Sequence, residues 1–128
     1  MNTDLSIEFF PPQTPEGVEK LRAVRAKLAV LKPSFFSVTF GAGGSTRERT
    51  FSIVKEMVTE GLPAAPHLSC IGSTHSNIRD ILSQYREAGI RRIVALRGDL
   101  PSGMAEAGEF RYANELVEFI RAETGNHF

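Results

Sequence analysis

Residues 65–96, APHLSCIGSTHSNIRDILSQYREAGIRRIVAL, decide the fold class of this chain. A short apolar run within 65–71 opens the stretch, and a second run, 92–96, closes it. The segment between them has apolar residues at helical spacing and ends at Gly89, a residue type typical of helix C-caps. Its apolar face consists of Ile78, Ile81, Leu82 and Tyr85. A strand, a helix and a strand in this order predict two parallel strands joined by a right-handed crossover.

The same alternation extends in both directions along the chain. We predict further strands at 6–10 and 35–40, and a first helix with Thr14 as N-cap and Pro15 at its first position. The apolar positions of this first helix are Val18, Leu21, Val24, Leu28 and Leu31. The second helix has apolar positions at Phe51, Val54, Met57 and Val58 and a C-cap at Gly61. The apolar positions of the last helix are Leu116, Val117 and Ile120. The predicted class is therefore α/β, with a parallel sheet.

Four strand–helix units fit one domain spanning residues 1–128. They fit either an open doubly wound sheet or half of a TIM (β/α)8 barrel, and the pattern alone does not separate the two. A half-barrel would leave unpaired backbone at its first and fourth strands. Such edges favour a second copy or a further segment that covers them.

Composition excludes several classes of partner. Fifteen basic and fifteen acidic residues give zero formal net charge, so no net field favours nucleic acid or an anionic membrane. No run approaches the roughly 18 apolar residues of a membrane span, and we expect a cytoplasmic protein. The single cysteine, Cys70, has no partner for a disulfide or a metal site and is expected to be a small core residue.

Polar residues lie in or directly after each predicted strand, most of them toward its carboxyl end. These are Glu8, Thr39, His67, and the pair Arg97 and Asp99. Ligands of parallel α/β folds bind at the carboxyl ends of the strands, because the βα loops gather there. The sequence therefore predicts a ligand site at this edge of the sheet.

Glu8 lies between Ile7 and Phe9, and a carboxylate buried among apolar residues is costly unless it is paired. We therefore expect Glu8 to hold a proton near neutral pH and to act as a general acid. The alternative is that Glu8 pairs with a basic neighbour and only holds strands together. Alternatives also stand for the others: a core role for His67, packing for Thr39, and a loop salt bridge between Arg97 and Asp99.

The glycine-rich turn at Gly41, Gly43 and Gly44 does not complete a dinucleotide fingerprint, because Thr46 stands where the third glycine is required. We interpret it as a tight turn. The sequence also lacks a phosphate-binding loop of the G-x-x-x-x-G-K-[ST] type, H-E-x-x-H, C-x-x-C and G-x-S-x-G. Common hydrolase and kinase chemistries therefore have no support.

Four strings in order along the chain closely resemble bacterial methylenetetrahydrofolate reductases. They are EFFPP at 8–12, SVTFGA at 37–42, APHL at 65–68 and ALRGDLP at 95–101. The resemblance implies an eight-stranded βα-barrel that binds FAD at the carboxyl ends of its strands. In this family NADH or NADPH reduces the flavin, which passes hydride to 5,10-methylenetetrahydrofolate and yields 5-methyltetrahydrofolate in one-carbon metabolism.

The resemblance also implies roles for particular residues. Glu8 matches the general acid that protonates the folate, and Asp99 matches an aspartate close to the flavin and the folate pterin. Positions that contact FAD in the family are matched by Thr39, His67, Arg97, Gly98, Tyr112 and Ala113. Tyr112 and Ala113 rest on the resemblance alone.

Members of this family are about twice as long as this chain. We therefore expect the N-terminal half of the reductase barrel, which by itself does not complete the active site, because catalysis depends on positioning and a preorganised environment. The alternative is a non-catalytic half-barrel that binds flavin or pairs with a second copy of itself.

Overall fold

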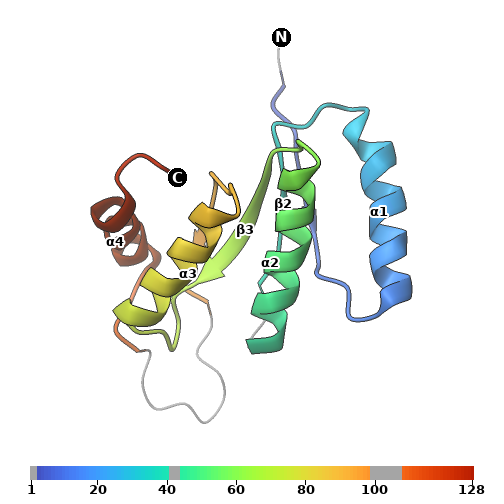
Figure 1. Cartoon of the computed structure of the whole chain (residues 1–128). Helices are drawn as coiled ribbons and strands as arrows, with labels where there is room; N and C mark the ends of the chain where they lie inside the picture. The colour runs from blue at the N-terminus through green and yellow to red at the C-terminus, as the bar shows by residue number, and fades with distance from the viewer. Residues whose placement is uncertain (1–2, 41–43, 99–107) are drawn as a thin grey trace.

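The computed structural model describes residues 3–40, 44–98 and 108–128. Four parallel strands form one sheet in chain order: β1 (Ser6–Phe9), β2 (Phe35–Val38), β3 (Ala64–Ser69) and β4 (Val94–Leu96). Four helices alternate with them: α1 (Pro15–Ala29), α2 (Gly44–Thr59), α3 (His75–Glu87) and α4 (Ala113–Thr124). The predicted α/β class with four strand–helix units is confirmed (Figure 1).

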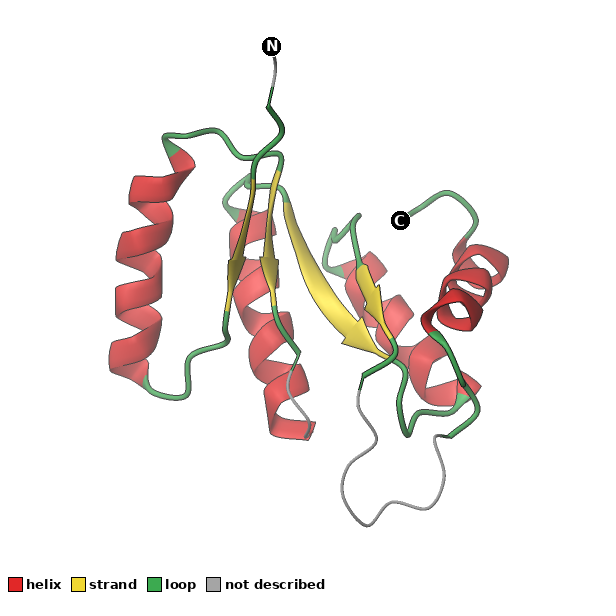
Figure 2. Cartoon of the chain, turned by 180° about the vertical axis from the view of Figure 1, so that it is seen from behind, coloured by secondary structure: helices red, strands yellow, loops and turns green. Residues whose placement is uncertain are grey.

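The order of the strands separates the two architectures that the sequence left open. Each strand pairs in parallel with the strand before it, so the sheet is built in one direction. A doubly wound sheet instead reverses direction at a switch point, which places helices on both of its faces. In Figure 2, α2 and α3 lie behind the strands, α1 and α4 lie to either side, and none of these helices covers the near face of the sheet. This is the arrangement of half a βα-barrel.

Local sequence signals fix the helix ends. The Thr14 hydroxyl accepts a hydrogen bond from the Gly17 amide at 3.0 Å, and Pro15 occupies the first turn of α1, as predicted. Gly61 and Gly89, which follow α2 and α3, adopt φ values of +88° and +82°. A residue with a side chain would be strained in this left-handed conformation, which accounts for the glycines there.

The strands are shorter than the sequence predicted. β1 ends at Phe9 because Pro11 and Pro12 follow and lack an amide proton. β2 ends at Val38, although one further ladder bond runs from the Thr39 amide to the Phe9 carbonyl at 2.9 Å. The short strands leave the residues after them free to form the rim of the sheet.

The core lies between the sheet and the helices. The whole predicted face of α3, namely Ile78, Ile81, Leu82 and Tyr85, is buried there. Cys70 is fully buried, as predicted, and burial raises the pKa of its free thiol. Among the described residues, no helix combines the length and the apolar character needed to cross a bilayer.

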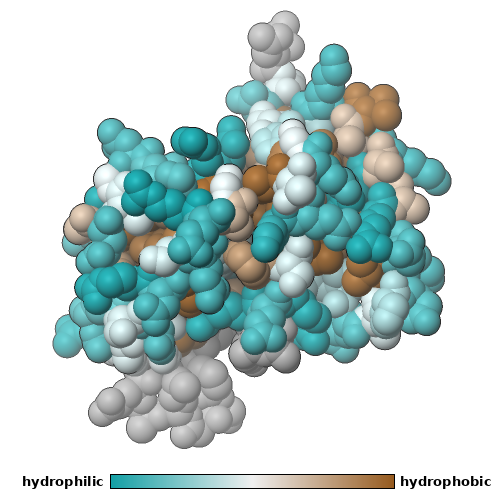
Figure 3. Space-filling view, in the orientation of Figure 1, coloured by the Kyte–Doolittle hydropathy of each residue, from teal (hydrophilic) through white to brown (hydrophobic). Residues whose placement is uncertain are grey.

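Three predicted core positions are wrong. Val24 of α1, Leu31 just after it and Val117 of α4 have exposed fractions of 45%, 59% and 45%. Helix α1 lies at the end of the row of helices and has one helical neighbour, so only a narrow stripe of it is covered. The space-filling view shows a hydrophobic area over the C-terminal end of α1 on an otherwise largely hydrophilic surface (Figure 3).

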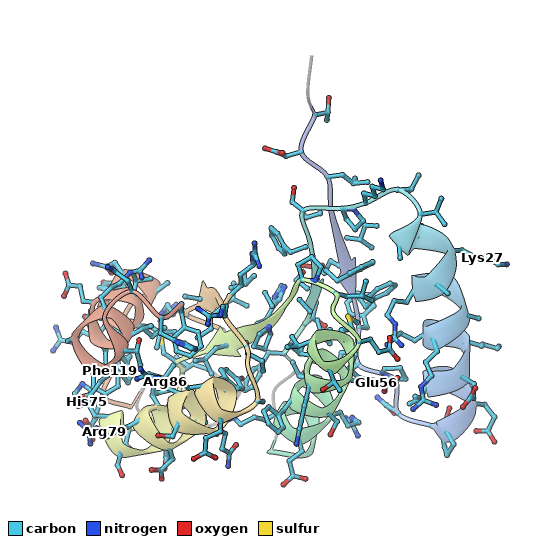
Figure 4. The ribbon with its side chains drawn as sticks, turned by 45° about the horizontal axis from the view of Figure 1, so that its top comes forward. Lys27, Glu56, His75, Arg79, Arg86 and Phe119 are labelled. Atoms are coloured by element: carbon cyan, nitrogen blue, oxygen red, sulfur yellow. The ribbon has the colours of Figure 1, made fainter. Side chains whose placement is uncertain are left out.

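Charged and aromatic contacts join neighbouring helices. Glu56 of α2 points toward α1 and accepts hydrogen bonds from Arg22 at 2.8 Å and from the buried Arg25 at 3.2 Å (Figure 4). At the other end of the row, the Arg79 guanidinium of α3 lies over the Phe119 ring of α4, 5.6 Å from its centroid. The helix layer is therefore tied together at both ends.

Candidate functional site

Polar side chains from three neighbouring strands meet on the open face of the sheet. Side chains alternate between the two faces of a strand. Phe36 and Val38 belong to the core, so Ser37 between them points to the open face. The backbone of Ser37 pairs with that of Glu8 in β1, and His67 lies two residues beyond Ala65, the partner of Ser37 in β3.

His67 is the centre of this group. Its Nε2 atom lies 3.3 Å from Oε1 of Glu8 and 3.2 Å from Oγ of Ser37. The structure thus brings Glu8 and His67, two of the predicted site residues, into contact. Asp99, the third residue expected there, lies outside the described residues. We name Glu8, Ser37 and His67 the strand triad.

The predicted burial of Glu8 is wrong in this chain. Its side chain is 56% exposed, whereas that of His67 is 9% exposed. The physical reason is the alternation of the strand: Ile7 and Phe9 pack against the core, and Glu8 between them points to the opposite, uncovered face. The Glu8 carboxylate is therefore accessible from the open face of the sheet.

Burial lowers the pKa of His67 below its ordinary value of 6.5, and the neighbouring Glu8 carboxylate partly offsets this effect. His67 is therefore neutral at pH 7. A proton on Nε2 can be donated toward the Glu8 carboxylate or the Ser37 hydroxyl, since both oxygens lie near that nitrogen. The triad thus joins a neutral imidazole to a carboxylate that solvent or a ligand can reach.

This pKa shift predicts that stability depends on pH. The unfolded chain binds the His67 proton more readily than the folded chain, so the free energy of unfolding decreases as the pH falls below 6.5. The contribution of neutral His67 to the free energy of unfolding is complete above pH 6.5. It is lost as the pH falls through the lower pKa that His67 has in the folded chain. Urea unfolding between about pH 7 and pH 5 should show a smaller decrease for His67→Gln than for the wild type.

Two features isolate the effect of His67 in this experiment. Glu56 and Glu123 have pKa values lowered from 4.5, so they titrate below the chosen window. At pH 8 His67 is neutral in both the folded and the unfolded chain. The difference in free energy of unfolding between the wild type and His67→Gln at pH 8 therefore gives the effect of the substitution that is unrelated to titration. Equal pH dependence in the two proteins would contradict the assignment.

A second group of predicted residues surrounds the carboxyl end of β3. The Arg97 carbonyl accepts hydrogen bonds from the Ile71 amide and from the Ser69 hydroxyl, each at 2.9 Å. The side chain of Arg97 donates from Nε to the Arg111 carbonyl at 2.9 Å. Arg97 therefore connects the end of β3 to the segment that leads into α4.

Both the backbone conformation and the close packing at position 98 require glycine there. Its φ is +83°, and a Cβ placed on it would lie 2.1 Å from Oγ of Ser69 and 2.9 Å from Cγ2 of Ile71. Only glycine allows the backbone after Arg97 to pass this close to β3.

Tyr112 and Ala113 lie at the start of α4. Tyr112 is the N-cap residue, its side chain makes no capping bond, and it is 61% exposed. Ala113 is the first helical residue. Backbone amides in the first turn of a helix lack partners within the helix and attract anions. The Glu115 amide already donates to the Tyr112 carbonyl at 3.1 Å, and the Glu115 carboxylate places a negative charge in the same turn. The amides of Ala113 and Asn114 are therefore the candidates for holding an anion at the start of α4.

Thr39 lies just past β2 and is half-buried. Its amide donates to Phe9, and its carbonyl accepts from the Thr50 hydroxyl at 2.7 Å. These bonds fix its backbone at the rim. Within the described residues, no hydrogen bond or ion pair links the strand triad directly to Arg97, Gly98, Tyr112 or Ala113. Strand β3 connects the two groups, because it carries both His67 and Ser69.

Sequence reasoning missed Ser37 as a site residue. The signal was present, because Ser37 is a polar residue between Phe36 and Val38, just as Glu8 lies between Ile7 and Phe9. Serine is common in strands, however, and its position beside His67 depends on the register between β2 and β3.

A family model described as methylenetetrahydrofolate reductase matches residues 1–128. The chain belongs to the methylenetetrahydrofolate reductase family. The resemblance predicted from the four sequence strings is thereby confirmed. Within this family, four strand–helix units built in one direction correspond to half of a TIM barrel.

Individual reductases of the family match most of this chain. It is 47% identical over 120 residues to the 5,10-methylenetetrahydrofolate reductase of Pectobacterium carotovorum subsp. carotovorum, covering 92% of this chain and 39% of that protein. The enzyme of Escherichia coli (strain K12) is 46% identical over 119 residues, covering 92% and 40%. A probable methylenetetrahydrofolate reductase (NADH) of Oryza sativa subsp. japonica is 37% identical over 131 residues, covering 98% and 22%. The chain thus spans about two fifths of the length of these bacterial relatives.

Proposed function

We propose that this chain forms the N-terminal part of the active site of an FAD-dependent reductase. The reaction is the reduction of 5,10-methylenetetrahydrofolate to 5-methyltetrahydrofolate, with NADH or NADPH as the source of electrons. Family membership supports the reaction class. The observation that carries the proposal is the strand triad, which presents the Glu8 carboxylate on the open face of the sheet beside His67.

In this proposal Glu8 is the general acid. A group that protonates a substrate must be within hydrogen-bonding reach of it, and the exposed Glu8 side chain is accessible to a ligand on the open face. His67 holds the carboxylate through Nε2 and limits the positions that Glu8 can take. Asp99 keeps the role that the resemblance implies, close to the flavin and the pterin.

The residues at the start of α4 fit FAD. Its diphosphate would be held by the backbone amides of Ala113 and Asn114 in the first turn, where the N-cap side chain makes no capping bond. Tyr112 is exposed there and Arg97 is anchored beside it through Arg111. Gly98, His67 and Thr39 complete the proposed binding residues along the rim. When bound, FAD supplies the group that takes hydride from the nicotinamide and delivers it to the folate.

Binding of FAD can be tested with a backbone substitution. Ala113→Pro removes one amide proton from the first position of α4, where proline is compatible with a helix, and Tyr112 already has the extended backbone that proline requires of the residue before it. Loss of one hydrogen bond to a charged group corresponds to about a tenfold weaker affinity. The expected result is that the purified chain quenches FAD fluorescence and that Ala113→Pro binds about tenfold more weakly.

Riboflavin is the matched control ligand, because it lacks the diphosphate. Its affinity should be the same for the wild type and Ala113→Pro, and circular dichroism should show equal helix content. An unchanged affinity of Ala113→Pro for FAD would contradict the placement of the diphosphate. If the purified chain binds neither FAD nor riboflavin, the proposal that this chain binds flavin by itself is wrong.

Folate reduction is tested in a chimera. This chain replaces the matching 40% of the Escherichia coli relative, to which it is 46% identical. The expected result is a yellow protein that oxidises NADH in the presence of 5,10-methylenetetrahydrofolate. A chimera that folds and holds flavin but does not reduce folate would overturn the proposed function. Measurement with NADPH tests the choice of nicotinamide nucleotide, and a cytoplasmic location stays a prediction of the sequence.

A second candidate is a non-catalytic half-barrel that pairs with a copy of itself. The observation that favours it is that β1 and β4 each pair along one side only within the described sheet, while one face of that sheet is open. Sedimentation of the purified chain separates the candidates. A stable dimer that binds flavin, together with an inactive chimera, would favour this second function.

A further inference from the structure

We propose that His67, oriented by Ser37, shares a proton with Glu8 and restores the proton that Glu8 gives to its substrate. This inference rests on the proposed function, in which Glu8 is the acid. It assigns Ser37 as a positioning residue and gives His67 a role that acts through Glu8. The observation behind it is that a single nitrogen, Nε2 of His67, lies close to both other members of the strand triad.

Geometry limits the arrangements of protons at this nitrogen. When Glu8 is ionised, Nε2 carries the proton and donates it to the carboxylate at 3.3 Å or to the Ser37 hydroxyl oxygen at 3.2 Å. When Glu8 is protonated, its hydroxyl donates to Nε2, and the ring proton lies on Nδ1. The ring can therefore hold its partner in either protonation state of Glu8.

After Glu8 has given its proton to the substrate, the neutral ring still carries its proton on Nδ1, and exchange with water moves this proton to Nε2, where it faces the Glu8 carboxylate. A second proton from water is then taken up at Nδ1, and the ring becomes positively charged. The Nε2 proton then passes to the Glu8 carboxylate. The ring is neutral again, Glu8 is protonated, and no electrons have moved.

The surroundings of His67 favour this short-lived charge rather than a permanent one. The ring is 9% exposed, which disfavours the charged form, while the Glu8 carboxylate favours it. Ser37 faces the ring from β2 and carries no charge. From β4, Val94 occupies the position paired with His67 and also carries no charge. Glu8 is thus the one charged group of the described residues that acts on His67.

Nuclear magnetic resonance of the flavin-free chain tests the inference. The sequence holds three histidines, so the imidazole nitrogens of His67 can be resolved and titrated. Glu8→Gln removes the negative charge, and the expected result is a His67 titration midpoint at lower pH than in the wild type. Glu109→Gln is the matched control, because it removes the carboxylate beside His75 and should leave the His67 curve in place.

The tautomer of His67 supplies the second readout. Above the midpoint, nitrogen shifts should show the proton on Nε2 in the wild type and a mixture of tautomers in Ser37→Ala. Ser37→Thr keeps the hydroxyl and should restore the wild-type pattern. An unchanged midpoint in Glu8→Gln, or an unchanged tautomer in Ser37→Ala, would overturn the inference.

These measurements separate this inference from the proposed function. They use the chain without flavin or folate, so their outcome does not depend on catalysis. An active chimera with an unresponsive His67 would overturn proton sharing alone. A responsive His67 with a folded but inactive chimera would overturn the reductase function alone.

Discussion

Glutamine in place of Glu8 is expected to slow folate reduction by the chimera about 100-fold or more, the usual contribution of a general acid. Glutamine has the shape of glutamate but has no acidic proton to give. Reduction of the flavin by NADH does not need this proton, so it should stay close to the wild-type rate. Stopped-flow absorbance of the flavin measures the two half-reactions separately.

Glu16→Gln is the matched control for this prediction, because it makes the same chemical change at an exposed glutamate in the first turn of α1. Both half-reactions should be unaffected by it. A comparable loss in both half-reactions of Glu8→Gln would instead show that Glu8 holds strands together through His67. That was the structural alternative left open by the sequence.

Alanine in place of Gly98 is expected to lower the free energy of unfolding by about 3 kcal/mol. Two costs add: about 1–2 kcal/mol for a left-handed backbone conformation and about 1–3 kcal/mol for overpacking. The overpacking arises because the added Cβ would lie 2.1 Å from Oγ of Ser69, whose hydroxyl is bonded to the Arg97 carbonyl. Urea unfolding at pH 8 measures the change.

Gly61→Ala separates the two costs of this substitution. Gly61 has a φ of +88°, close to the +83° of Gly98, but a Cβ added to it meets no atom within 4 Å. Gly61→Ala should therefore lower the free energy of unfolding only by the cost of the left-handed backbone conformation, about 1–2 kcal/mol. Equal losses at Gly61 and Gly98 would contradict the close approach of the Gly98 backbone to β3.

The sequence predicted the order and type of the elements because each carries its own local signals. The spacing on α3 identified its buried face, and Thr14 with Pro15 identified the start of α1. It failed for Val24 and Val117, because helical spacing does not tell which apolar positions a neighbour covers. The direction in which the sheet is built also depends on contacts between units, which the strand pattern does not contain.

The candidate site was predictable where polar residues stand out against apolar strands. Glu8 and His67 were identified in this way, but the exposure of Glu8 was not, because it depends on which face of β1 the helices cover. The sequence did not predict Ser37, because its position beside His67 depends on the register between β2 and β3. Tyr112 and Ala113 carry no distinctive chemistry, so only the resemblance to a family could suggest them.

The chain-order sheet has a consequence for how the protein forms. Each strand pairs with the one synthesised just before it, so every pairing closes over a single intervening helix. Pairing across one helix costs less loop-closure entropy than pairing with a more distant strand, and the N-terminal strands leave the ribosome first. The growing polypeptide can therefore add one strand at a time to a sheet that already exists, while later segments are still leaving the ribosome.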